Sequence, residues 1–152
     1  MRLYGGAMRI AVSSDMLSGI ATGLIPELER RGHEVQPFGA LQPGDRSDWA
    51  WASEAAARDV SSGDSDQAIV CCWTGTGASI AANKVAGIRA ALCADAPTAE
   101  GARKWNDANV LAISLRTTSE AELGEILDAW FDAAPSDDPQ DAANIEHVDE
   151  IS

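Results

Sequence analysis

The chain lacks the features that mark several classes of protein. No apolar run reaches the roughly 18–20 residues that a membrane-spanning helix needs, and the first residues, MRLYGGAMRIAV, carry no signal-peptide pattern. Three cysteines and two histidines occur in 152 residues, without a Cys-x-x-Cys pair, which indicates neither a disulfide framework nor a zinc site. We therefore expect a cytoplasmic protein with reduced thiols, no membrane segment, no metal and no cofactor.

Basic residues are scarce and end early in the chain. Eleven Lys and Arg face 24 Asp and Glu, which gives a formal charge of −13, and no Lys or Arg follows Arg116. A chain without a basic stripe cannot displace the counterions of phosphate groups, so we expect no nucleic-acid partner and no anionic membrane partner. The acidic segment 135–152 is expected to be a solubilising face. Its last part could also form a helix that packs on a second subunit.

The remaining composition is that of one soluble globular domain over residues 1–152, with 45% hydrophobic and 23% charged residues. Short apolar runs alternate with helical patterns along the chain. The predicted strands cover residues 9–14, 33–38, 67–73, 88–93 and 110–115. The predicted helices cover about 18–31, 49–62, 78–85, 98–106 and 119–131, with a final helix over 142–151 as an option. This order predicts an α/β fold, with an open parallel sheet of five strands and helices on both faces.

The candidate site lies where strands end, because ligands of such sheets bind beyond the carboxyl ends of the strands. The segment after the third predicted strand is the most informative, since Gly75 and Gly77 flank Thr76. This turn and the following helix direct backbone N–H groups towards one point, which suits a phosphate or an enediolate oxygen. A purely structural turn is the alternative, because Ile80 replaces the third glycine of a dinucleotide-binding fingerprint.

One cysteine is a candidate catalytic residue, and the other two are interpreted as core residues. Cys72 ends an apolar strand just before a helix begins, where a thiol can become a thiolate near neutral pH. A small buried hydrophobic residue is the alternative for Cys72, and it is our interpretation of Cys71 and Cys93. Adjacent residues of a strand point to opposite faces, so Cys71 and Cys72 are not expected to form a disulfide.

The run from Ser79 to Cys93, with Cys72 and Gly75 before it and residues 106–112 after it, closely resembles the ribose-5-phosphate isomerase B and galactose-6-phosphate isomerase (RpiB/LacAB) family. The resemblance covers about residues 8–131, so residues 1–7 are interpreted as an extension. It implies a Rossmann-like three-layer α/β/α domain. It also implies a homodimer or dimer of dimers, with the site at the subunit interface, and metal-independent aldose–ketose isomerisation through a cis-enediolate.

The resemblance also implies roles for individual residues. Cys72 matches the catalytic base, Thr74 the threonine that assists it, and Asp15 the aspartate that begins the site. The oxyanion cradle corresponds to the N–H groups of Gly75, Thr76, Gly77, Ala78 and Ser79. Asn106 matches an asparagine that contacts the substrate, and Trp49 falls at an aromatic position of the family.

Four departures from the family pattern bear on the substrate. Met16 and Trp105 replace histidines that act on the phosphate and in opening the sugar ring, and an indole N–H only donates. Trp73 replaces a glycine, and the C-terminal arginines that hold the phosphate have no counterpart, because Ala143 and His147 fall at about their positions. Arginine–phosphate bonds are charge-assisted, so their loss weakens phosphate binding. The indoles of Trp49, Trp73 and Trp105 could instead contact a sugar ring or an apolar substituent.

The sequence therefore predicts an aldose–ketose isomerase that acts on a sugar or sugar phosphate other than ribose 5-phosphate. The absence of a ring-opening acid suits a four-carbon or open-chain substrate. Two alternatives stay open: a noncatalytic sugar-binding protein or subunit of a heteromer, and a phosphatase or nucleotide-binding protein that shares only the glycine turn. Whether His147 reaches a neighbouring site is left undecided by the sequence.

Overall fold

The computed structural model describes residues 6–151, and the greater part of the predicted N-terminal extension, residues 1–5, lies outside them, as does residue 152. Five strands form one parallel sheet in the order β2-β1-β3-β5-β4. The strands are β1 (Arg9–Ser14), β2 (Glu34–Gly39), β3 (Gln67–Cys72), β4 (Ala90–Leu92) and β5 (Val110–Ser114). The predicted parallel sheet of five strands is thus confirmed.

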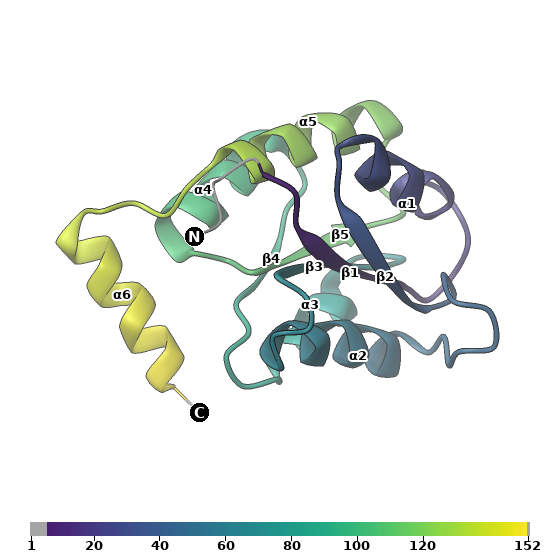
Figure 1. The fold of residues 1–152 in the computed structure, drawn as a ribbon, viewed down its shortest axis with the longest axis horizontal. Helices are drawn as coiled ribbons and strands as arrows, with labels where there is room; N and C mark the ends of the chain where they lie inside the picture. Colours follow the sequence, from purple (N-terminus) through teal and green to yellow (C-terminus); the bar gives the residue numbers. More distant parts are fainter. Residues whose placement is uncertain (1–5, 152) are drawn as a thin grey trace.

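Six helices accompany the sheet within the described part of the chain. They are α1 (Ala21–Arg30), α2 (Trp49–Ser61), α3 (Thr76–Asn83), α4 (Ala96–Asn106), α5 (Glu120–Asp132) and α6 (Pro139–Glu150). Figure 1 shows α1, α4 and α5 on one face of the sheet and α2 and α3 on the other. This is the three-layer α/β/α arrangement that the resemblance implied.

Burial on both faces explains why the central strands have continuous apolar sequences. Every residue of β3 and β5 is buried. Cys71 belongs to the cluster under α1, α4 and α5, whereas Cys72 belongs to the cluster under α2 and α3. The two thiols therefore lie on opposite faces, and all three cysteines are free.

Local capping chemistry sets where several helices begin. The predicted capping box is present at α5, where the Ser119 hydroxyl accepts from the Glu122 N–H at 3.1 Å and Glu122 accepts from the Ser119 N–H at 2.9 Å. The helix predicted from residue 78 begins instead at Thr76, because Gly75 supplies a left-handed N-cap at φ +76°. Residues 88 and 89, which were predicted to begin the fourth strand, are irregular instead. The Arg89 N–H donates to the Asn109 side chain at 2.8 Å.

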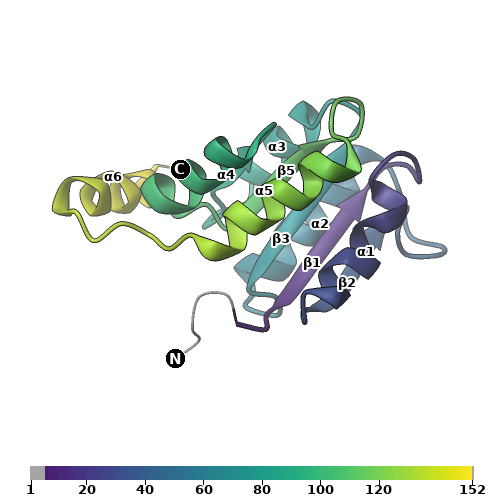
Figure 2. The same ribbon diagram turned by 90° about the horizontal axis from the view of Figure 1, so that it is seen from above.

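The last helix stands apart from the rest of the molecule. Figure 2 shows α6 beyond an extended segment, away from the sheet, and none of its residues is buried. Polar contacts of this region include the bond from the Ser136 N–H to the Lys104 carbonyl at 2.8 Å and the ion pair of Arg89 with Asp149 at 3.0 Å, and α6 also contacts α4. The optional helix of the acidic segment is thus present. Within residues 6–151 no helix is both long and apolar enough to cross a membrane.

Candidate active site

The site is built where the chain changes direction within the sheet. After β1 the chain continues to β2 on one side, and β3 then lies on the other side of β1, which opens a crevice at the carboxyl ends of β1 and β3. Ser14 pairs with Cys71 in the register of these strands, so Asp15 and Cys72 follow at neighbouring ends. The Ser14 hydroxyl donates to the Met16 carbonyl at 2.7 Å and fixes the turn that carries Asp15.

The turn after β3 has the left-handed glycine and the helix start that the predicted cradle requires. Gly75 adopts φ +76°, and α3 begins at the next residue. The first N–H groups of a helix have no acceptor within the helix, which leaves those of Thr76, Gly77 and Ala78 available. The Ser79 N–H, in contrast, donates to the Gly75 carbonyl at 3.0 Å. Of the N–H groups predicted for the cradle, that of Ser79 is therefore already used inside α3.

Close contacts surround both glycines of the turn. A Cβ at Gly75 would lie 2.6 Å from Leu92 Cδ1 and 2.9 Å from the backbone nitrogen of Ser114. A Cβ at Gly77 would lie 2.8 Å from Cε3 of Trp49, so the Trp49 indole rests on the Gly77 backbone. The hydroxyl oxygens of Thr74 and Thr76 are 2.7 Å apart and share a hydrogen bond across the turn.

One cavity of about 320 Å³ brings together most of the predicted residues. Its lining consists of Asp15, Trp49, Cys72, Trp73, Thr74, Thr76 and Gly77. These residues come from the ends of β1 and β3 and from the first turns of α2 and α3. A thiol, a carboxyl and two hydroxyls thus face the same space as the start of a helix.

Asp15 occupies an unusual position in this cavity. Its Oδ1 is buried and has no hydrogen-bond partner among the described residues. Burial raises the pKa of the Asp15 carboxyl, and the residue's own backbone N–H only partly offsets this effect. A carboxyl held in this way keeps its proton to a higher pH than an exposed aspartate, which suits it to donate and accept protons.

The three thiols differ in their surroundings, since two are buried in the core and one lines the cavity. The pKa of the Cys71 thiol is strongly raised, chiefly because the side chain is fully buried, and burial raises that of Cys93 to about 12. Both thiols therefore stay protonated and serve as core residues. Cys72 is 5% exposed and is the cysteine that lines the cavity.

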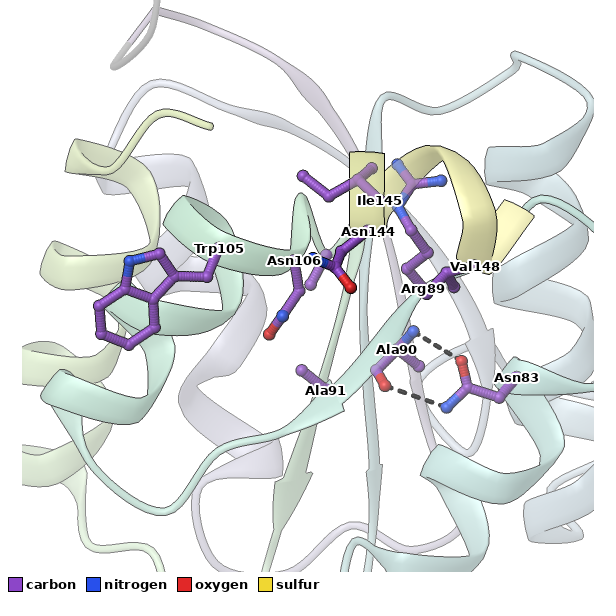
Figure 3. A pocket seen from close by; sticks show the side chains of 10 residues that line it. Asn83, Arg89, Ala90, Ala91, Trp105, Asn106, Asn144, Ile145 and Val148 are labelled. Atoms are coloured by element: carbon purple, nitrogen blue, oxygen red, sulfur yellow. Dashed lines mark hydrogen bonds between the residues drawn. The ribbon is translucent and has the colours of Figure 1, made fainter. Parts of the chain in front are cut away.

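The structure places three of the predicted residues elsewhere. Trp105 and Asn106, at the end of α4, line a second cavity of about 250 Å³ together with Asn144, Ile145 and Val148 of α6. Figure 3 shows this second cavity and the two hydrogen bonds by which the Asn83 side chain holds the backbone of Ala90. His147 lies exposed on α6, with its Nδ1 3.6 Å from Glu150. Within one chain, Trp105, Asn106 and His147 therefore do not line the cavity of Cys72.

Two residues that the sequence analysis did not single out fix the far side of the turn. The carbonyl of Trp73 accepts from the Ser114 hydroxyl at 3.0 Å and from the Arg116 N–H at 2.9 Å. Ser114 is the last residue of β5 and Arg116 lies two residues beyond it, so a search of the strand ends could have identified both.

Every other arginine in residues 6–151 has a carboxylate partner, whereas the Arg116 side chain forms no ion pair there. No group of three metal-binding side chains lies together in the described chain.

Comparisons with known proteins agree on one family. Residues 10–148 match the family described as Ribose/Galactose Isomerase. Ribose-5-phosphate isomerase B of Escherichia coli is 39% identical over 110 residues, which is 72% of this chain and 73% of that protein. A solved structure of ribose-5-phosphate isomerase B from Clostridium thermocellum superposes with a TM-score of 0.84 at 37% identity, covering 95% of this chain and 97% of the other.

Two further relatives carry names of four-carbon substrates. D-erythrulose-4-phosphate isomerase of Pectobacterium atrosepticum is 32% identical over 127 residues, which is 83% of this chain and 84% of that protein. 4-deoxy-4-sulfo-D-erythrose isomerase of a Clostridium species is 35% identical over 107 residues, which is 70% of this chain and 67% of that protein. The relatives thus share a type of reaction and differ in the sugar.

Proposed function

Because this chain belongs to the Ribose/Galactose Isomerase family and is an isomerase of that family, we propose that it interconverts an aldose and a ketose through a cis-enediolate. The single observation that carries this proposal is the shared cavity of Cys72, Asp15 and the start of α3. Isomerisation needs a base beside the carbon next to the carbonyl and donors for the oxygen that becomes negative. The cavity offers both.

The proposed reaction assigns one step to each group. The Cys72 thiolate removes the proton from C2 of the aldose, and the electron pair moves to the carbonyl oxygen on C1. The N–H groups of Thr76, Gly77 and Ala78 stabilise the resulting enediolate. Cys72 then returns the proton to C1, which gives the ketose. The Thr74 hydroxyl, held by Thr76 at 2.7 Å, orients the thiolate.

Asp15 is proposed to move the proton between the two oxygens. The enediolate must gain a proton on O1 and lose one from O2 before the ketone forms. A carboxyl whose pKa is raised by burial keeps its proton to a higher pH than an exposed aspartate, which suits it to pass a proton between the two oxygens. Its Oδ1, which has no protein partner in the described chain, is free to bind a substrate hydroxyl.

The substrate is proposed to be an open-chain, four-carbon sugar. In the family pattern Trp105 stands where a histidine opens the sugar ring, and an indole cannot take up that role. A tetrose substituted at position 4 has no hydroxyl with which to close a five-membered ring, so it needs no such group. The names of two relatives, with substrates derived from erythrulose and erythrose, support this choice.

Arg116 is the proposed contact for an anionic group at the end of that sugar. It follows β5, and its backbone N–H is bonded to the carbonyl of Trp73 in the cavity wall. Its guanidinium is not used by any carboxylate in residues 6–151, unlike the other arginines there. An unpaired arginine is suited to a phosphate or sulfonate because it can offer two parallel N–H bonds.

We further propose that the site is completed by a second copy of the chain. α6 projects without any buried residue, and Val148 and Ile151 leave apolar side chains exposed. The same holds for Trp105 on α4, which is 55% exposed. In a homodimer or dimer of dimers, Trp105, Asn106 and His147 of one chain would approach the Cys72 cavity of the other. Light scattering of the purified chain tests this directly, because a monomer would contradict it.

The decisive experiment follows hydrogen exchange by proton NMR in deuterium oxide. Wild type, Cys72→Ala and the control Cys93→Ala are incubated with four- to six-carbon aldoses and ketoses, each with and without a terminal phosphate. We expect deuterium at the carbon next to the carbonyl with wild type and Cys93→Ala, and none with Cys72→Ala. Full exchange by Cys72→Ala would contradict its role as the base. Saturable binding without any exchange would favour a noncatalytic sugar-binding protein.

A further inference from the structure

Two large indoles stand at the mouth of the candidate active site. Trp49 is 46% exposed and Trp73 is 51% exposed, and both line the cavity that contains Cys72. They come from different elements, Trp49 from the first residue of α2 and Trp73 from the residue after β3. Exposed aromatic side chains that converge on one concave surface mark a place where a ligand is recognised.

Both indoles are attached to rigid parts of the structure. The Trp49 ring lies on Gly77, where an added Cβ would be 2.8 Å from Cε3 and 3.1 Å from Cδ2. Trp73 is fixed through its carbonyl, which accepts hydrogen bonds from the Ser114 hydroxyl and the Arg116 N–H. The Trp49 ring is therefore packed on the turn, and the backbone that carries the Trp73 ring is held in place.

The chemistry of the cavity lining, more than its size, limits which groups bind between these indoles. Its volume of about 320 Å³ is near the lower end of the roughly 300–1,000 Å³ usual for small-molecule sites. Apart from its single N–H, an indole offers apolar faces that cannot replace the water around a hydroxyl. Each further hydroxylated carbon of a sugar would thus lose hydration against Trp49 or Trp73 without gaining a partner.

We propose that Trp73, supported by Trp49, is a specificity-determining residue that limits the substrate to a short sugar of four carbons. This inference rests on the proposed isomerase function, because it concerns the length of substrate that the same cavity accepts. Removing the Trp73 ring extends the cavity at its mouth, and longer sugars then gain room without any change to the groups around Cys72.

The test compares substrate length in wild type and in Trp73→Ala, with Trp73→Phe as an intermediate. Trp51 supplies the matched control, since it is a half-exposed tryptophan of α2 that stacks on Arg46 at 3.6 Å and does not line this cavity. We expect Trp73→Ala to raise the ratio of kcat/KM for a five-carbon over a four-carbon substrate by about tenfold or more, the range for one added group in a pocket. We expect Trp51→Ala to leave this ratio unchanged. An equal ratio in wild type and Trp73→Ala would overturn the inference.

A binding experiment keeps this result separate from the proposed function. Erythritol, ribitol and sorbitol have four, five and six carbons and no carbonyl, so they cannot isomerise. Their dissociation constants are measured by NMR for wild type and Trp73→Ala. Tighter binding of erythritol by wild type, and loss of that preference in Trp73→Ala, would support the length limit even if no sugar were converted. The same preference in both proteins, or no binding of any of the three by either, would overturn it.

Discussion

Replacing Gly75 with alanine tests whether the cradle is fixed by steric limits. Gly75 adopts φ +76°, a left-handed conformation that costs about 1–2 kcal/mol for a residue with a Cβ. The new Cβ would also lie 2.9 Å from the Ser114 nitrogen and 3.0 Å from the Ile113 carbonyl carbon, both in the backbone of buried β5. Overpacking of this kind costs about 1–3 kcal/mol. After an offset of about 0.4–1 kcal/mol from the stiffer unfolded chain, we expect Gly75→Ala to lower the free energy of unfolding by about 1–5 kcal/mol.

Gly87→Ala is the matched control for the backbone part of that cost. Gly87 has a similar φ of +82°, but nothing lies within 4 Å of an added Cβ. Its substitution carries only the conformational strain, offset in part by about 0.4–1 kcal/mol from the stiffer unfolded chain. The difference between the two variants thus isolates the contact with β5, at about 1–3 kcal/mol.

Urea denaturation measures that difference. At a slope of about 2 kcal/mol per molar urea, a difference of about 2 kcal/mol separates the two midpoints by about 1 M. Both variants are compared at one protein concentration, because assembly would make the midpoint depend on concentration. Equal midpoints would refute the reasoning, since they would mean that β5 yields to the extra methyl group.

Three further predictions concern single interactions. Trp130→Phe leaves the buried Gln67 side chain without its 2.8 Å partner and should cost about 1–3 kcal/mol in urea denaturation; an unchanged midpoint would mean that this bond contributes nothing. The raised pKa of Asp15 means that the folded state holds its proton more tightly, so wild-type stability should fall as pH rises from about 3.8 through the raised pKa. Asp15→Asn should remove that decline, and parallel pH profiles of urea stability would contradict it. Asp149→Asn removes the ion pair with Arg89 and should speed amide hydrogen exchange in α6 without a large change in midpoint, because such exposed pairs contribute about 0.2–1 kcal/mol; unaltered exchange would show that α6 is held by other contacts.

The sequence predicted the elements well where the signal is local. Continuous apolar runs indicated strands buried on both faces, and β3 and β5 are indeed buried throughout. The pair Ser119 and Glu122 predicted the start of α5 because a capping box involves only neighbouring residues. Errors at element ends had local causes as well, such as the left-handed N-cap at Gly75 that starts α3 two residues early.

Local sequence patterns do not show which strand ends meet, and it was the family resemblance that assigned Asp15 and Cys72 to one site. Asp15 and Cys72 share a cavity because β1 and β3 are neighbours in the sheet, an order that local patterns do not encode. The residues at the end of α4 were assigned to the same site by resemblance, yet Trp105 and Asn106 line a different cavity in the single chain. Contacts between remote residues, such as the Trp130 indole on Gln67, have no local signal either.

The division between backbone and side chains suggests how one site can keep its reaction while its substrate changes. The proposed cradle consists of backbone N–H groups, so its geometry depends on glycine at position 75, where an added Cβ would meet the backbone of β5. Trp49 and Trp73, in contrast, line the same cavity with their side chains, so a different residue at either position would change the space beside the turn. Reaction type should therefore follow from the turn after β3, and substrate length from the residues around it.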